Sequence, residues 1–248
     1  MEGRKVRARS ESFKDHFSQA TMFWNSMTAP EKEHIIEAFS FELGKCQETW
    51  IREGAVEMFI NVNLEMAQAI AKNIGVKPPA NGGSSVTKAS PALSLNNTVK
   101  SPATRKVGVL IDQGFNEAEV MEILEGLEAK GVQYKVVSEM QGKLKGTSGK
   151  EIEVDHTFST TDPVLYDAIY AVGGPDVSRK FAKEAARYIA EAFDHYKPIG
   201  ATHDGQQWLE AAGIENQPGV VAANTGSSFT SSFLEAIAAH RHWERQVE

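Results

Sequence analysis

The stretch Lys106-Val-Gly-Val-Leu-Ile111-Asp112-Gln-Gly114 decides the fold of this chain. Its short apolar run lies between a lysine and a turn sequence, which is typical of a buried strand. A helix is predicted over about 117–130, where the apolar residues lie on one face, and Gly131 ends it. A second apolar run, Val132–Val137, predicts the next strand. A strand, a helix and a strand in this order predict a βαβ unit with parallel strands.

The same alternation continues downstream of this unit. Gly142 to Val154 is predicted to form a small hairpin region, and Ala168–Val172 a buried strand closed by Gly173-Gly174-Pro175. Further strands are predicted at 198–202 and 220–221, and helices are predicted after 178, from Gly205 and over 227–238. Residues 105–248 are therefore predicted to form an α/β domain, a mainly parallel sheet with helices on both faces and the flavodoxin-like strand order.

Residues 1–76 predict a small all-α segment. Phe13, Phe17, Ala20 and Trp24 are spaced by four, three and four positions, which predicts one face of a helix. Thr28-Ala-Pro-Glu31 is typical of a helix start, with a capping box and a proline in the first turn. Asn63 is expected to cap a further helix that Gly75 ends.

Many aromatic residues fall in this helical segment, which is too small to bury all of them. The set suggests a docking surface rather than a free-standing domain: Phe13, Phe17, Phe23, Trp24, Phe39, Phe41, Trp50 and Phe59. Residues 77–104, rich in Pro, Ser, Asn and Gly and without a visible period, are expected to form a linker that is flexible or laid over a surface.

Composition excludes several classes of protein. The 248 residues are 41% hydrophobic and 24% charged, an ordinary globular balance, and the net charge of −7 argues against nucleic acid as the main partner. No apolar run approaches the roughly 20 residues of a membrane helix, so no membrane partner is expected. The single cysteine, Cys46, allows no intrachain disulfide. No secretory signal is visible; the start suits an internal piece of a longer chain, which leaves localisation unknown.

Two blocks of sequence resemble parts of known catalases. Arg9-Ser-Glu-Ser-Phe13-Lys-Asp-His-Phe17, then Phe23-Trp24, then Met27-Thr-Ala-Pro-Glu31, are similar to the helical segment that follows the haem barrel in catalases. Residues 105–238 resemble the extra flavodoxin-like domain of large-subunit catalases, within the glutamine-amidotransferase-like superfamily that also holds PfpI peptidases and holding chaperones. The resemblance implies a parent that is a homotetrameric haem catalase and disproportionates hydrogen peroxide, with the catalase barrel and sister subunits as partners.

The resemblance does not extend to the catalytic barrel. The chain contains no Arg-x-x-x-Tyr haem-ligating helix and no distal histidine with its asparagine. Because peroxide chemistry in this family needs an iron ligand and a distal acid–base group, we expect no cofactor in this chain, with haem confined to the parent, and no enzyme activity.

The turn at Ala201-Thr-His203-Asp204-Gly205 corresponds to the sharp strand-to-helix turn that carries the cysteine of PfpI relatives, usually Ala-x-Cys-His-Gly. In this register His203 occupies the cysteine position, and Glu119 matches the carboxylate that faces it. Gly173-Gly174 matches the turn whose amide would help to stabilise an oxyanion. The resemblance therefore predicts a vestigial nucleophile-elbow pocket made by Glu119, Gly173, Gly174, His203, Asp204 and Gly205, with no catalytic residue.

Three interpretations of this pocket remain open. His203 and Glu119 could form a hydrogen-bonded structural pair, the pocket could hold a small molecule or an anion near Gly205, or imidazole could act as a covalent nucleophile. Consecutive residues on a tight turn point in different directions, so Thr202, His203 and Asp204 cannot form a catalytic triad. Near the C-terminus, His240 and His242 supply too few ligands for a metal site, and a solvated tail is expected there.

Three functions follow from these observations. The chain could be a non-catalytic arm that stabilises the parent tetramer. It could also act as a holding chaperone, because exposed aromatic surface can bind unfolding client proteins. A cryptic small-molecule hydrolase or glyoxalase-like enzyme is the third alternative, and the missing cysteine at position 203 makes it the weakest.

Overall fold

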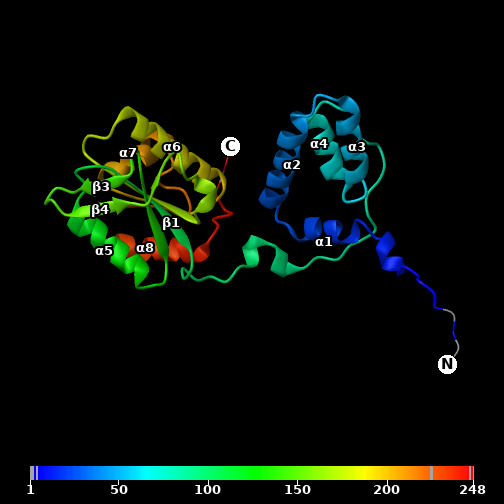
Figure 1. Ribbon diagram of the computed structural model, residues 1–248, viewed down its shortest axis with the longest axis horizontal. Coiled ribbons are helices and arrows are strands. Elements are labelled where there is room, and N and C mark those ends of the chain that lie inside the picture. The colour runs from blue at the N-terminus through cyan, green and yellow to red at the C-terminus, as the bar shows by residue number, and fades with distance from the viewer. Residues whose placement is uncertain (1–2, 4, 224–225, 246, 248) are drawn as a thin grey trace. The chain divides into compact units, whose positions relative to one another are not determined.

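The structure, a computed structural model, describes residues 3, 5–223, 226–245 and 247. The chain divides into two compact units, residues 1–98 and 99–248. They are a helical unit and an α/β unit, and each is described by itself (Figure 1).

The α/β unit is built on a parallel six-stranded sheet in the order β5-β2-β1-β6-β7-β8. Its strands are β1 (Lys106–Ile111), β2 (Gln133–Ser138), β5 (His156–Thr157), β6 (Ala168–Gly173), β7 (Ile199–Thr202) and β8 (Val220–Ala223). Without the two-residue strand β5 at its edge, the order is that of a flavodoxin-like sheet, which confirms the predicted fold class.

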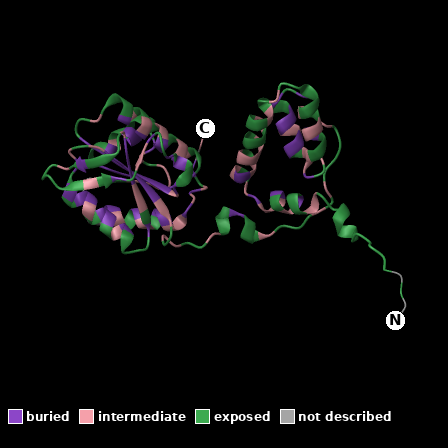
Figure 2. Ribbon diagram, in the orientation of Figure 1, coloured by how far each residue is buried: buried purple, intermediate pink, exposed green. Residues whose placement is uncertain are grey.

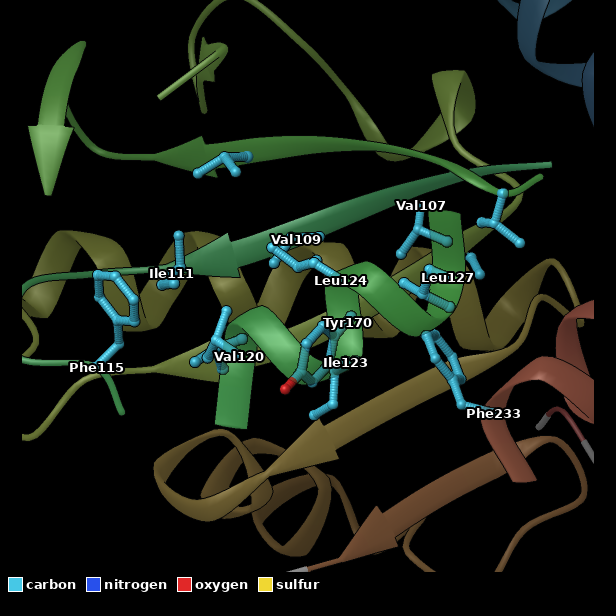
Figure 3. Packing of buried hydrophobic residues seen from close by; sticks show 14 of the residues in the cluster. Val107, Val109, Ile111, Phe115, Val120, Ile123, Leu124, Leu127, Tyr170 and Phe233 are labelled. Atoms are coloured by element: carbon cyan, nitrogen blue, oxygen red, sulfur yellow. The ribbon is translucent and has the colours of Figure 1, made fainter. Parts of the chain in front are cut away.

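Helices cover both faces of this sheet (Figure 1). One face carries α5 (Glu117–Glu128) and α8 (Gly226–Ala239), and the other carries α6 (Arg179–Asp194) and α7 (Gln206–Ala212). Strands β1 and β6 are buried almost throughout because helices cover them from both sides. Figure 3 shows side chains of one of the two cores, where α5 packs its apolar stripe on β1 and Tyr170 lies beside it. This packing fixes the first turn of α5 at the carboxyl end of β1.

A separate antiparallel hairpin follows β2, as predicted. Its strands are β3 (Gly142–Lys145) and β4 (Glu151–Val154). The backbone N–H of Gly114 donates to the Lys145 carbonyl at 2.8 Å, and the N–H of Thr147 donates to the Phe115 carbonyl at 3.0 Å. These bonds hold the tip of the hairpin against the loop between β1 and α5.

The helical unit consists of η1 (Glu11–Lys14), α1 (Ser18–Ser26), α2 (Ala29–Gly44), α3 (Thr49–Phe59) and α4 (Leu64–Asn73). The predicted starts of α2 and α4 are confirmed: Thr28 forms the full capping box with Glu31, and the Asn63 side chain accepts from the Met66 N–H at 2.9 Å. Its core contains Trp24, Val56, Val62, Met66, Ala67, Ile70, Ala71, Ile74 and Val76.

The predicted first helix face is wrong at its beginning. Helix α1 starts at Ser18, whose backbone N–H donates to the Asp15 carboxylate at 3.0 Å, and Phe13 lies 65% exposed in the preceding 3-10 turn. The local hydrogen bond to Asp15 outweighs the apolar spacing that suggested an earlier start. Trp24, assigned to the docking surface from the sequence, is buried in the core, and Phe17 and Phe59 pack against that core.

Much of the stretch 77–98 is laid over the helical unit rather than separate from it. The Asn25 side chain donates to the Val86 carbonyl at 2.9 Å, and the Ser90 N–H donates to Ser26 Oγ at 2.8 Å. Two short turns, η2 (Pro91–Leu93) and η3 (Leu95–Asn97), follow. The buried carboxylate of Glu31 accepts from Ser94 Oγ at 2.9 Å and from the Leu95 N–H at 2.8 Å.

The expected solvated tail after α8 is also wrong. His240 and His242 are buried, with 4% and 8% exposure, and the His242 N–H donates to the Tyr196 carbonyl at 3.0 Å. Arg245 is 3% exposed and donates to the carbonyl oxygens of Phe193, Lys197 and Pro218. The tail is packed because backbone carbonyls at the end of α6 and before β8 need donors, which Arg245 supplies.

Candidate functional site

A pocket of about 280 Å³ opens at the carboxyl ends of β1, β6 and β7. Ligands in open parallel sheets bind at this edge, where neighbouring strands lead into opposite helical layers. The pocket is lined by Gly114, Phe115, Asn116, Glu119, Val120, Thr147, Val172, Gly173, Gly174, Pro175, Thr202, His203 and Asp204. Of the six residues assigned to the site from the sequence, five line the pocket and Gly205 lies directly behind it.

The turn between β7 and α7 is sharp and carries an unusual backbone conformation. His203 adopts a φ of +42°, which few residues other than glycine adopt, at the first position of the 3-10 turn η5 (His203–Gly205). A Cβ atom on Gly205 would overlap the carbonyl oxygen of Ala171, so only glycine fits there. The close approach of the turn to β6 projects the imidazole outward, and it is 43% exposed.

Glu119 faces this imidazole from the first turn of α5. Its carboxylate Oε2 contacts His203 Nε2, and its side chain is only 9% exposed. Desolvation raises the pKa of Glu119, while the charge and hydrogen bond of His203 oppose that rise. The helix start is fixed by Asn116, whose side-chain oxygen accepts from the Glu119 N–H at 3.4 Å. The two residues predicted to face each other are therefore brought together by the packing of α5 beside β1.

The glycine pair after β6 closes the other wall of the pocket. Gly173 has a φ of +72°, and a Cβ there would lie 2.9 Å from the Trp208 ring. A Cβ on Gly174 would lie 2.5 Å from the carbonyl oxygen of Gln113, so the β1 and β6 loops touch through this glycine. Asp204 lines the same rim and is exposed, with its carbonyl oxygen accepting from the Gln207 side chain at 2.7 Å.

Sequence reasoning missed the role of Glu117. This carboxylate is 3% exposed and accepts from Thr147 Oγ1 at 3.0 Å, from the Ser148 N–H at 2.5 Å and from the Lys150 N–H at 3.2 Å. Desolvation would raise its pKa, but these hydrogen bonds outweigh desolvation and hold the pKa at about 2. Glu117 thereby fixes the hairpin turn that brings Thr147 to the pocket. A glutamate in a first helical turn is common, so the sequence carries no signal for this bond.

The site offers an imidazole and a buried carboxylate but no sulfur nucleophile. The lone cysteine, Cys46, belongs to the helical unit. Over the part of the chain that the structure describes, no three His, Cys, Asp or Glu side chains gather to hold a metal ion. Within the same residues, no helix is long and apolar enough to cross a bilayer. The carboxylate of Glu119 orients the His203 ring through its contact with Nε2.

Two segments of the chain match known protein families. Residues 103–247 match the family described as the C-terminal domain found in long catalases. The chain belongs to this long-catalase family. Residues 10–74 match a second family, described as catalase-related immune-responsive, which coincides with the helical unit. Both matches confirm the resemblance inferred from the sequence.

Several long catalases are similar to this chain over nearly its whole length. It is 53% identical to a catalase of Alkalihalophilus pseudofirmus over 99% of this chain and 36% of the relative. It is 43% identical to Catalase-2 of Bacillus subtilis over 100% of this chain and 36% of the relative. It is 33% identical to Catalase HPII of Pseudomonas aeruginosa over 99% of this chain and 35% of the relative. The chain thus spans about a third of the length of these long catalases.

Proposed function

We propose that this chain is the non-catalytic C-terminal part of a long haem catalase, where it stabilises the assembled enzyme, and that it also acts as a holding chaperone. The whole protein would disproportionate hydrogen peroxide with haem held in its barrel. The barrel and sister subunits would be the partners of this chain in a tetramer. The similarity to catalases across both units supports this assignment.

The observation that carries the proposal is the set of exposed apolar side chains in the helical unit, whose ribbon is exposed over much of its length in Figure 2. Six large apolar side chains from 23 to 58 are exposed although the unit has its own core: Phe23 45%, Phe39 40%, Phe41 68%, Trp50 70%, Ile51 39% and Met58 59%. Large apolar side chains are exposed at protein–protein contact sites, so we infer that another protein covers them. In the parent this surface would dock on the barrel, and in the isolated chain it would bind unfolding clients.

Aggregation suppression tests the chaperone part. A labile client enzyme is heated with an equimolar amount of the chain while light scattering is followed, and an inert acidic protein of similar size serves as reference. We expect scattering to fall only with the chain. Replacing Phe41 and Trp50 by serine should remove the effect, whereas replacing Val164 and Leu165, exposed on the α/β unit, should not. Unchanged scattering with the native chain would refute the chaperone role and leave the purely structural one.

Peroxide turnover and haem absorbance test the non-catalytic part. We expect the purified chain, mixed with haem and hydrogen peroxide, to release no more oxygen than haem alone. A stoichiometric haem spectrum with catalatic turnover would contradict the proposal. The stabilising role predicts that a long catalase lacking this region unfolds at a lower temperature than the whole enzyme.

The pocket gives weaker support to a hydrolase or glyoxalase-like activity, because the resemblance to PfpI peptidases puts His203 at the position where those proteins carry cysteine. Changing His203→Cys tests this alternative directly. Activity gained by that variant would show an intact but disarmed site. The Glu119–His203 pair as observed fits a hydrogen-bonded couple that stabilises the turn.

A further inference from the structure

We propose that His203 is a selectively reactive histidine, whose Nδ1 atom forms covalent adducts with small uncharged α,β-unsaturated aldehydes that enter the pocket beside Glu119. The inference rests on the geometry of the pocket and is independent of the chaperone role. It assigns a modification site and gives the pocket a class of ligand.

The contact with Glu119 orients the ring for this chemistry. Oε2 of Glu119 contacts Nε2, so the ring proton belongs on Nε2 and the lone pair on Nδ1. The His203 side chain is 43% exposed, so the ring is open to small molecules. A buried carboxylate also stabilises the positive charge that develops on an imidazole when its other nitrogen attacks a carbon atom.

The lining of the pocket selects the kind of electrophile. Among the described residues that line it there is no lysine or arginine, while the carboxylates of Glu119 and Asp204 are present, so anionic ligands are disfavoured. Phe115, Val120 and Pro175 supply apolar walls. The volume of about 280 Å³ admits a molecule of a few heavy atoms. Small, uncharged and electrophilic molecules fit these limits.

Conjugate addition balances without an oxidant, a reductant or a leaving group. The Nδ1 lone pair forms a C–N bond to the β-carbon of the aldehyde, and the carbon–carbon π bond breaks toward the carbonyl as an enolate. The enolate takes a proton at its α-carbon from water, and the resulting hydroxide takes the Nε2 proton of the alkylated ring. The adduct contains every atom of the aldehyde and of the imidazole.

The chain offers an internal reference for reactivity. His16 is exposed in the helical unit, whereas His240 and His242 are buried. Exposure alone therefore predicts that His16 reacts at least as fast as His203, and activation by Glu119 predicts the opposite. Glu125 is exposed further along α5 and serves as a matched carboxylate.

Site-resolved labelling of the folded chain with acrolein tests the proposal. Peptide mass spectrometry would follow each histidine separately from adducts on Cys46 and on lysines. We expect His203 to react about tenfold faster than His16. Glu119→Gln should lower the His203 rate to that of His16, and Glu125→Gln should leave it unchanged. Equal rates at His203 and His16 would overturn the proposal, as would equal effects of the two variants.

A second measurement avoids any effect of substitution on folding. The native chain is labelled with 4-oxo-2-butenoate, which carries the same reactive group and a carboxylate. The lining predicts that this anionic probe loses the preference for His203 while still labelling His16. A preserved preference would show that the pocket does not select its ligand by charge and would refute that part of the proposal.

Discussion

Replacing Arg245 by methionine should destabilise the α/β unit more than any exposed charge substitution. The guanidinium donates to carbonyl oxygens at 2.7–3.0 Å, in four hydrogen bonds that join α6, the turn before β7 and the loop before β8. The side chain is almost fully buried and its guanidinium also lies 4.6 Å from the Phe193 ring centroid. Methionine keeps the apolar stem and removes every donor.

The magnitude follows from two opposing contributions. Hydrogen bonds from a charged donor contribute about 1.5–3 kcal/mol each, and unpaired buried carbonyls add to the loss. Desolvation lowers the pKa of Arg245 from 12.5 to about 10. Removing the buried charge therefore returns about 3 kcal/mol. We expect a net loss of at least about 3 kcal/mol of unfolding free energy, which lowers the melting temperature of a unit of this size by at least roughly 6 °C.

Calorimetry of the whole chain measures this change. Arg187→Met is the matched control, because Arg187 forms ion pairs with Asp162, Glu184 and Glu191 while its side chain is 36% exposed. Exposed ion pairs contribute about 0–1 kcal/mol, so the control should shift the transition little. A shift of less than about 2 °C for Arg245→Met, or equal shifts for both variants, would refute the reasoning.

Three further predictions test other contacts. Gly205→Ala should destabilise the α/β unit by about 1–3 kcal/mol in urea unfolding, because its Cβ would overlap the Ala171 carbonyl. Gly54→Ala, where the added Cβ meets open space on a helix, should stabilise the helical unit by about 0.5–1 kcal/mol. Glu31→Ala should cost the helical unit about 2 kcal/mol and increase proteolytic cleavage within 77–98, because four groups donate to that carboxylate. Glu33→Ala, at an exposed position, should change neither the stability nor the cleavage. Desolvation lowers the pKa of buried His240 and His242 below 6.5. The unfolded chain therefore binds protons first, and the free energy of unfolding should fall as the pH drops through 6.5. A double variant, His240→Gln with His242→Gln, whose unfolding midpoint falls as steeply as that of the native chain between pH 7 and 5 would contradict this.

Asp167 makes the stability depend on pH in a second, more acidic range. Desolvation raises the pKa of Asp167, but hydrogen bonds from His240 and from the Lys106 N–H outweigh it and hold the pKa at about 2. A lowered carboxyl pKa contributes stability that is present above the unfolded value of 3.8 and is lost as the pH falls through about 2. His240 and His242 therefore change the stability as the pH drops through 6.5, and Asp167 changes it only below pH 3.8.

The sequence by itself determined the features that depend on neighbouring residues. The apolar run at 107–111, the stripe of α5 and the stop at Gly131 specify a βαβ unit through strand and helix periodicity. Thr28 and Asn63 specify helix starts because the capped amides lie within three residues of the cap. The strained turn at His203 was predicted only through a resemblance to a known turn, because no periodic pattern of apolar residues marks a positive φ.

Only the tertiary structure decided which distant groups meet. Helix α5 lies beside β1 and so brings Glu119 to His203, whereas Glu117 holds the hairpin turn beside the pocket. The two glutamates lie in the same helical turn and cannot be told apart in the sequence. The tail after α8 looked polar, yet Arg245 is buried because backbone carbonyls from three distant segments converge on it. Burial and hydrogen-bond satisfaction depend on the whole fold. The local charge pattern alone therefore predicted that the tail after α8 is solvated.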